Sequence, residues 1–145
     1  MLKLNTTIIS ITGSCGKTTL KEMIGTTLKK ISRTSYSPKS FNNRYGVPVS
    51  LFNLKQNDEF GVVEVGMDRK GEIDNLTRII KPDLGIITNI SYAHSKNFKS
   101  INQIADAKAE IMNHIKKNGV IVLNRDDYFF NYHKKFAQKK KLKVV

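Results

Sequence analysis

The stretch ITGSCGKTT, residues 11–19, decides the fold class of this chain. It follows a short β-branched run at 8–11 and precedes a helix-like pattern at 18–31, so its glycines fall between a strand and a helix. There, glycines let backbone N–H groups turn inward around phosphate oxygens, and the helix amino terminus adds partial positive charge. The stretch therefore predicts a nucleotide-binding turn, although Ile11 stands where the standard phosphate loop G-x-x-x-x-G-K-T has its first glycine. A plain glycine turn before a helix is the alternative.

The residues of this turn have separate expected tasks. The lysine reaches the β- and γ-phosphates of the nucleotide, and a threonine hydroxyl binds Mg²⁺. Cys15 is interpreted as a non-catalytic member of the loop. The expected nucleotide-binding residues are Gly13, Ser14, Cys15, Gly16, Lys17, Thr18 and Thr19.

Apolar runs rich in β-branched residues alternate with helix-like patterns along the chain. Buried strands are expected at 8–11, 60–65, 84–90 and 120–123, with shorter strands at 33–37 and 142–145. Helices are expected at 18–31, 72–80, 101–115 and 127–137. This alternation predicts an α/β fold in which a phosphate loop belongs to a mostly parallel sheet with helices on both faces. Because the chain stops inside an expected strand, we expect one domain, residues 1–145, incomplete at its carboxyl end.

Composition narrows the possible partners. The 145 residues carry 25 Lys and Arg against 12 Asp and Glu, a formal charge of +13, which suits nucleic acid, an anionic surface or small anions. The lysine runs lack interleaved aromatic side chains, so we interpret them as a solvated face and expect no nucleic-acid partner; a nucleic-acid-binding protein is the alternative. One cysteine indicates a reducing compartment, and no run approaches the roughly 20 apolar residues that span a bilayer. We expect a cytoplasmic protein without a membrane partner.

Polar residues follow two of the expected strands at the edge where the phosphate loop lies. Glu64 closes one apolar strand, and a lone carboxylate there is costly unless it meets a cation. Glu64 is therefore a candidate Mg²⁺ ligand, with a strand-end glutamate reaching solvent as the alternative. Thr88 and Asn89 end the strand 84–90 and His94 follows it, all at this edge, and His94 is a candidate for a metal or substrate role. An idle, exposed histidine is the alternative.

Two stretches stay ambiguous on the residues alone. SFNNRYGVPVSL, residues 40–51, brackets polar side chains with turn formers and suits a binding loop, or only a turn. Lys108 lies in the apolar stripe of ADAKAEIM, residues 105–112. Physical reasoning favours a snorkelling side chain whose ammonium group reaches water.

Several segments together resemble, in order and spacing, the central ATP-binding domain of Mur ligases. They are ITGSCGKTT, SFNNRYGVPVSL, VVEVGMDRKGEIDNLTRIIKPDLGIITNISYAHSKNF, SINQIADAKAEIM and GVIVLNRDD. The likeness is closest to the branch of the family that adds D-alanyl-D-alanine to UDP-N-acetylmuramoyl-tripeptide, and it covers nearly the whole chain. It implies an ATP-dependent acid–amino-acid ligase of peptidoglycan precursor synthesis, in which an acyl phosphate forms and the incoming amine then displaces phosphate.

The resemblance also implies roles for single residues. Lys17 would steady the β- and γ-phosphates of ATP, and Thr18 would hold one Mg²⁺ together with Glu64. His94 matches the histidine that serves a second metal, and Lys108 matches the family lysine that is carbamylated and helps to hold that metal. Lys17, His94 and Lys108 are thus the residues expected to act in catalysis.

Asn43 matches a family asparagine on the nucleotide or metal side, with Asn42 competing for the alignment. Family members also carry an amino-terminal domain that binds the UDP-sugar and a carboxyl-terminal domain that closes over ATP. We expect both in cis or in trans, and expect this chain alone to be inactive. The alternatives are a truncated, non-catalytic nucleotide-binding module, or another Mur-like synthetase of the folylpolyglutamate or cyanophycin type.

Overall fold

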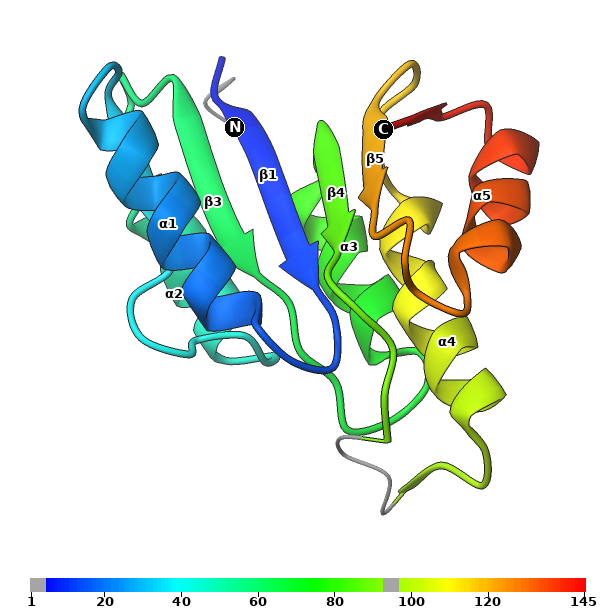
Figure 1. Cartoon of the computed structure of the whole chain (residues 1–145). Coiled ribbons are helices and arrows are strands. Elements are labelled where there is room, and N and C mark those ends of the chain that lie inside the picture. Colours follow the sequence, from blue (N-terminus) through cyan, green and yellow to red (C-terminus); the bar gives the residue numbers. More distant parts are fainter. Residues whose placement is uncertain (1–4, 93–96) are drawn as a thin grey trace.

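A computed structural model describes residues 5–92 and 97–145 as one sheet with flanking helices (Figure 1). The strands are β1 (Thr7–Thr12), β2 (Thr34–Tyr36), β3 (Phe60–Glu64), β4 (Leu84–Ile87), β5 (Val120–Leu123) and β6 (Lys143–Val144). The helices are α1 (Lys17–Lys29), α2 (Gly46–Phe52), α3 (Glu72–Ile80), α4 (Ile101–Ala109), the 3₁₀ helix η2 (Glu110–Asn113) and α5 (Phe130–Lys139). The strand order is β2-β3-β1-β4-β5-β6, and every pairing is parallel. The predicted α/β fold with a mostly parallel sheet is confirmed.

Alternate strand residues pack toward opposite faces of the sheet. Ile9, Ile11 and Val62 pack against α1 on one face. Ile8, next to Ile9, and Val63, next to Val62, point to the other face. There they belong to the larger core, which α2, α3, α4 and α5 share. Helices therefore cover both faces, as the alternating apolar pattern predicts. No helix among the described residues is long and apolar enough to cross a bilayer.

The structure differs from the predicted elements mainly at one place. The stretch 40–51 is not only a loop, because α2 begins at Gly46 inside it. Pro48 is the third residue of α2, within the first turn, where backbone N–H groups have no intrahelical acceptor and a proline removes nothing. Elsewhere the bounds shift: the strand predicted to reach residue 90 ends at Ile87, and the helix predicted to reach residue 115 becomes 3₁₀ at Glu110.

The sheet topology brings three strand ends together. β1 lies between β3 and β4, and its register places Ile11 opposite Glu64 and Thr12 opposite Ile87. The order of strands along the sheet reverses beside β1. In open α/β sheets, ligands bind outside the carboxyl ends of the strands at such a point. This edge is where α1 begins, immediately after the glycine turn that follows β1.

Candidate functional site

The phosphate loop, residues 13–19, takes a backbone path that only glycine follows without strain at two points. Gly13 has φ +147° and Gly16 has φ +79°. A Cβ atom built on Gly13 would lie 1.8 Å from Oγ1 of Thr88. α1 starts directly after Gly16, so the amino terminus of this helix faces the loop.

The segment after β4 holds the loop from the side. The backbone oxygen of Asn89 accepts the Ser14 N–H at 2.9 Å, and its Oδ1 accepts the Cys15 N–H at 3.0 Å. The Thr88 hydroxyl donates to the Cys15 carbonyl at 2.6 Å. The sequence placed Thr88 and Asn89 at this edge, but it did not indicate that they fix the path of the phosphate loop.

Two lysine side chains converge on this loop. The Nζ atoms of Lys17 and Lys108 each lie 2.9 Å from the carbonyl oxygen of Gly13, although Lys108 is 95 residues away in sequence. Lys108 is 2% exposed, so the snorkelling interpretation is wrong: its ammonium group stays inside. Burial, together with the positive charge of Lys17, lowers the pKa of Lys108 to about 7. The structure thus places a lysine of unusual acidity beside the expected phosphate site.

A buried carboxylate lies at the same edge. Glu64, the last residue of β3, is 1% exposed, so the alternative of a strand-end glutamate reaching solvent is wrong. Its Oε2 accepts the Thr18 hydroxyl at 2.8 Å, and its Oε1 accepts the Asn42 side-chain N–H at 2.7 Å. Carboxylate and hydroxyl oxygens are ligands that suit Mg²⁺.

The two neighbouring asparagines have different contacts. Asn42 reaches Glu64, whereas the Oδ1 of Asn43 accepts the backbone N–H groups of Tyr45 and Gly46 at the start of α2, both at 3.0 Å. Both asparagines line the cavity described next. The sequence could not choose between them, because the choice depends on how the turn before α2 is folded.

A cavity of about 650 Å³ opens beside the phosphate loop. Cations from four segments line it: Lys17, Arg44, Arg69 and Lys108. His94, predicted to serve a metal, lies outside the described residues. Within the described residues, no group of three or more His, Cys, Asp or Glu side chains could hold a metal ion.

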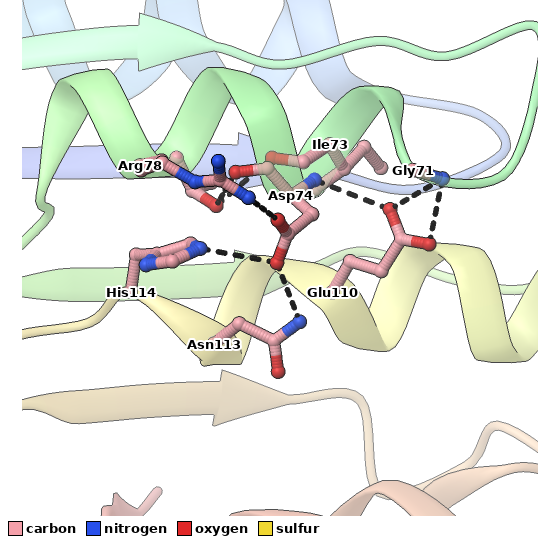
Figure 2. Close-up of polar contacts among 8 residues, drawn as sticks. Gly71, Ile73, Asp74, Arg78, Glu110, Asn113 and His114 are labelled. Carbon is pink, nitrogen blue, oxygen red and sulfur yellow. Dashed lines mark hydrogen bonds and ion pairs between the residues drawn. The ribbon is translucent and has the colours of Figure 1, made fainter.

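A polar network supports the segment that forms one wall of this cavity (Figure 2). Both carboxylate oxygens of Glu110 accept the Gly71 N–H, at 2.8 and 3.0 Å, and Oε2 also accepts the Asp74 N–H at 3.1 Å, at the start of α3. Burial raises the pKa of Glu110 above its ordinary value, although these backbone donors oppose the shift. No sequence pattern indicated this link between η2 and α3.

Asp74 gathers side chains from two elements in the same network. Burial alone would raise the pKa of Asp74, but hydrogen bonds from Asn113 and Arg78 and the neighbouring His114 hold that pKa below its ordinary value. The contacts from Asn113, in η2, and from His114, which follows it, tie α3 to this segment and so help to fix the loop between β3 and α3.

Comparison with known proteins identifies the family of this chain. A model of the Mur ligase middle domain matches residues 11–145. The chain belongs to the Mur ligase family. It is 41% identical over 128 residues to the UDP-N-acetylmuramoyl-tripeptide–D-alanyl-D-alanine ligase of Buchnera aphidicola subsp. Acyrthosiphon pisum, covering 88% of this chain and 28% of that relative. The ligase of the same name from Bacillus subtilis is 42% identical over 125 residues, covering 86% of this chain and 27% of the relative.

Solved structures agree with these relatives. MurF from Acinetobacter baumannii superposes with a TM-score of 0.93 at 34% identity, over 97% of this chain and 31% of that one. MurF from Thermotoga maritima, solved in complex with ADP, gives a TM-score of 0.86 at 31% identity, over 97% and 32%. FolC from Escherichia coli, at 16% identity and a TM-score of 0.74, shares the fold. The chain spans somewhat more than a quarter of the length of the curated relatives it matches.

Proposed function

We propose that this chain is the central, ATP-binding domain of a ligase that adds D-alanyl-D-alanine to UDP-N-acetylmuramoyl-tripeptide. One observation carries the proposal. Lys17 and Lys108 line one cavity at the carboxyl edge of the sheet, in a member of the Mur ligase family. The Thr18–Glu64 pair adjoins this lining, because Thr18 follows Lys17 and Glu64 bonds to Asn42. A phosphate loop, a buried carboxylate and a basic cavity are what phosphoryl transfer to a carboxylate requires.

The phosphate loop would bind ATP, with Lys17 beside its β- and γ-phosphates. Thr18 and Glu64 would hold Mg²⁺, because their oxygen atoms lie 2.8 Å apart on two rigid elements. When bound, Mg²⁺ neutralises charge on the phosphates and on the transferring phosphoryl group. Asn42 keeps the Glu64 carboxylate in place through its side-chain N–H.

Lys108 would supply a second anionic ligand after reaction with carbon dioxide. A pKa of about 7 leaves about half of its amine neutral at pH 7, and the neutral amine is the form that adds carbon dioxide to give a carbamate. A carbamate at this position would suit a second Mg²⁺, with His94 as a further proposed ligand. The burial that makes an ammonium ion unfavourable here therefore favours the neutral amine, which is the form that reacts with carbon dioxide.

The cavity would hold the carboxylate end of the acyl substrate next to the γ-phosphate. A carboxylate oxygen would bond to the γ-phosphorus as ADP leaves, and the amine of D-alanyl-D-alanine would then displace phosphate from the acyl phosphate. Lys17 and the other cations of the cavity stabilise negative charge during these steps. The chain would act with the flanking ligase domains, in cis or in trans, because it spans only part of its relatives.

The nucleotide site is tested by calorimetric titration of the chain with ATP and Mg²⁺. We expect Lys17→Ala to weaken ATP binding by tenfold or more, and the exposed Lys30→Ala, at the far end of α1, to leave it unchanged. Retained affinity in Lys17→Ala would overturn the assignment. The reaction is tested by adding flanking domains of a relative in trans and measuring phosphate release. Release should require both the UDP-N-acetylmuramoyl-tripeptide and D-alanyl-D-alanine.

A further inference from the structure

Lys21 is a lysine with no access to solvent. It is 0% exposed and ranks first by volume among the fully buried side chains of the described residues. Its ammonium group has three donors. They meet the carbonyl oxygens of Ser37, at 2.8 Å, and Lys39, and the carboxylate of Glu22, at 2.8 Å. A buried cation is tolerated only with such partners, so the position demands an acceptor on every N–H.

Two of these acceptors belong to a strained segment. Lys39 has φ +48°, a left-handed conformation that is unfavourable for a residue with a Cβ atom. Such a conformation persists only where surrounding contacts enforce it. The Lys21 ammonium group donates hydrogen bonds to both ends of this turn, at Ser37 and Lys39, and so holds the turn against α1.

The far side of the same segment surrounds Glu64. The Ser37 hydroxyl oxygen accepts the Glu64 backbone N–H at 3.1 Å, and the Asn42 side chain donates to its carboxylate at 2.7 Å. Ser40 Oγ lies 3.5 Å from Thr18 Oγ1. Residues 37–42 thus contact both oxygen ligands that we propose for Mg²⁺.

We propose that Lys21 is a positioning residue for the Mg²⁺ site: it fixes residues 37–42, which in turn set the relative placement of Thr18 and Glu64. The contacts close a ring, from Lys21 to Ser37, from Ser37 to Glu64, from Glu64 to Thr18, and along one turn of α1 back to Lys21. The inference rests on the proposed function. Lys21 itself is too deeply buried to touch the nucleotide.

Packing alone does not explain a lysine here. An apolar side chain of similar length in a buried position is often as stable as an ion pair or more so, because it avoids the desolvation of charge. What an apolar side chain cannot do is bind two carbonyl oxygens of a left-handed turn in a fixed direction. The role of the lysine is therefore to fix the positions of residues 37–42, which surround Glu64.

The test measures ADP affinity of the chain with and without Mg²⁺, and takes the ratio as the Mg²⁺-dependent gain. We expect Lys21→Met to reduce this gain about tenfold or more, as removal of groups that orient metal ligands does, while the Mg²⁺-free affinity stays close to wild type. Lys29→Met is the matched control, because Lys29 lies on the same helix over the same Tyr36 ring, at 4.5 Å from its centroid, but is exposed. This control should keep the full gain.

Each other outcome decides the matter. A folded Lys21→Met variant that keeps the wild-type gain, or loses affinity equally with and without Mg²⁺, overturns the positioning role. If Lys21→Met does not fold, Ser37→Ala replaces it. That change removes the acceptor of the Glu64 N–H, together with a 3.4 Å hydrogen bond to the Val62 carbonyl, and leaves the carbonyl contact to Lys21. An unchanged gain in Ser37→Ala then overturns the proposal. Absence of any gain in the wild type would instead refute the Mg²⁺ site, and the role of Lys21 with it.

Discussion

The hydroxyl of Thr18 lies 2.8 Å from Oε2 of Glu64, although the two residues are 46 positions apart. One belongs to the first turn of α1 and the other ends β3. Because β3 pairs with β1 in parallel and α1 follows β1, the sheet register sets this contact. The contact places a hydroxyl and a carboxylate at the amino terminus of a helix that also faces the phosphate loop.

Replacing the Glu64 carboxylate should weaken Mg²⁺ binding and leave Mg²⁺-free nucleotide binding nearly unchanged. Glu64→Gln keeps the size of the side chain and an acceptor for Thr18 but removes the charge that attracts Mg²⁺. We expect ADP affinity in the presence of Mg²⁺ to fall by roughly 10- to 100-fold, with little change in its absence. Glu59→Gln, an exposed site one residue before β3, is the control. An undiminished effect of Mg²⁺ in Glu64→Gln would contradict the assignment.

The two glycines of the phosphate loop should differ in their tolerance of alanine. Gly16→Ala meets only backbone strain, because no atom lies within 4 Å of the added Cβ, and should lower the free energy of unfolding by about 1–2 kcal/mol. Gly13→Ala adds a clash with the Thr88 side chain and should lower it by roughly 2–5 kcal/mol. Urea denaturation measures both. Equal losses in the free energy of unfolding would contradict this prediction, because they would mean that the Thr88 side chain moves aside without cost.

Asn89 should support nucleotide binding without touching the nucleotide. Asn89→Ala removes the acceptor of the Cys15 N–H, a hydrogen bond worth about 1 kcal/mol, and frees one side of the phosphate loop. We expect ADP affinity to fall by about fivefold, measured by calorimetry. Asn57→Ala, at an exposed loop position, should have no effect. If ADP affinity in Asn89→Ala stays as high as in the control, Asn89 contributes only to local stability and not to nucleotide binding.

Lys108 should react with carbon dioxide at neutral pH. Incubation with ¹³C-labelled bicarbonate is expected to give a carbamate signal in the NMR spectrum of the wild type and none in Lys108→Met. The physical reason is its pKa of about 7, which leaves far more neutral amine than an ordinary lysine has. A wild-type spectrum without a carbamate signal would contradict the proposed modification.

The same pKa predicts how stability depends on pH in buffer free of carbon dioxide. Lys108 has a pKa of about 7 in the folded chain, against an ordinary lysine pKa of 10.5 in the unfolded chain, so between these pH values the unfolded chain binds more protons. Its contribution to stability therefore rises as pH increases from about 7 towards 10. The melting temperature of the wild type, relative to Lys108→Met, should rise over this range. A constant difference would show that the folded chain does not lower the pKa of Lys108.

Much of the fold was predictable because its signals are local. Residues 72–80 and 120–123 formed the helix and strand that their apolar patterns predict. α2 was missed because Pro48 and the preceding asparagines look like a turn, whereas a proline is acceptable in the first turn of a helix. The sequence also identifies Glu64 and Lys108 as candidate site residues, but reasoning from the residues alone predicts different environments for them. It predicts that Glu64 meets a cation and that the Lys108 ammonium group reaches water, and the second prediction is wrong.

The sequence by itself determined the phosphate loop, the alternation of strands and helices, and the edge of the sheet where polar residues collect. These follow from backbone preferences and from the periodicity of apolar side chains, which depend on neighbours along the chain. Tertiary structure alone decided which groups meet: Lys108 with the Gly13 carbonyl, Asn42 with Glu64, and Lys21 with the turn before them. Such contacts join segments 16 to 95 residues apart. They exist because parallel crossovers return each strand end to the same edge, and no local pattern encodes which side chains that edge brings within bonding distance.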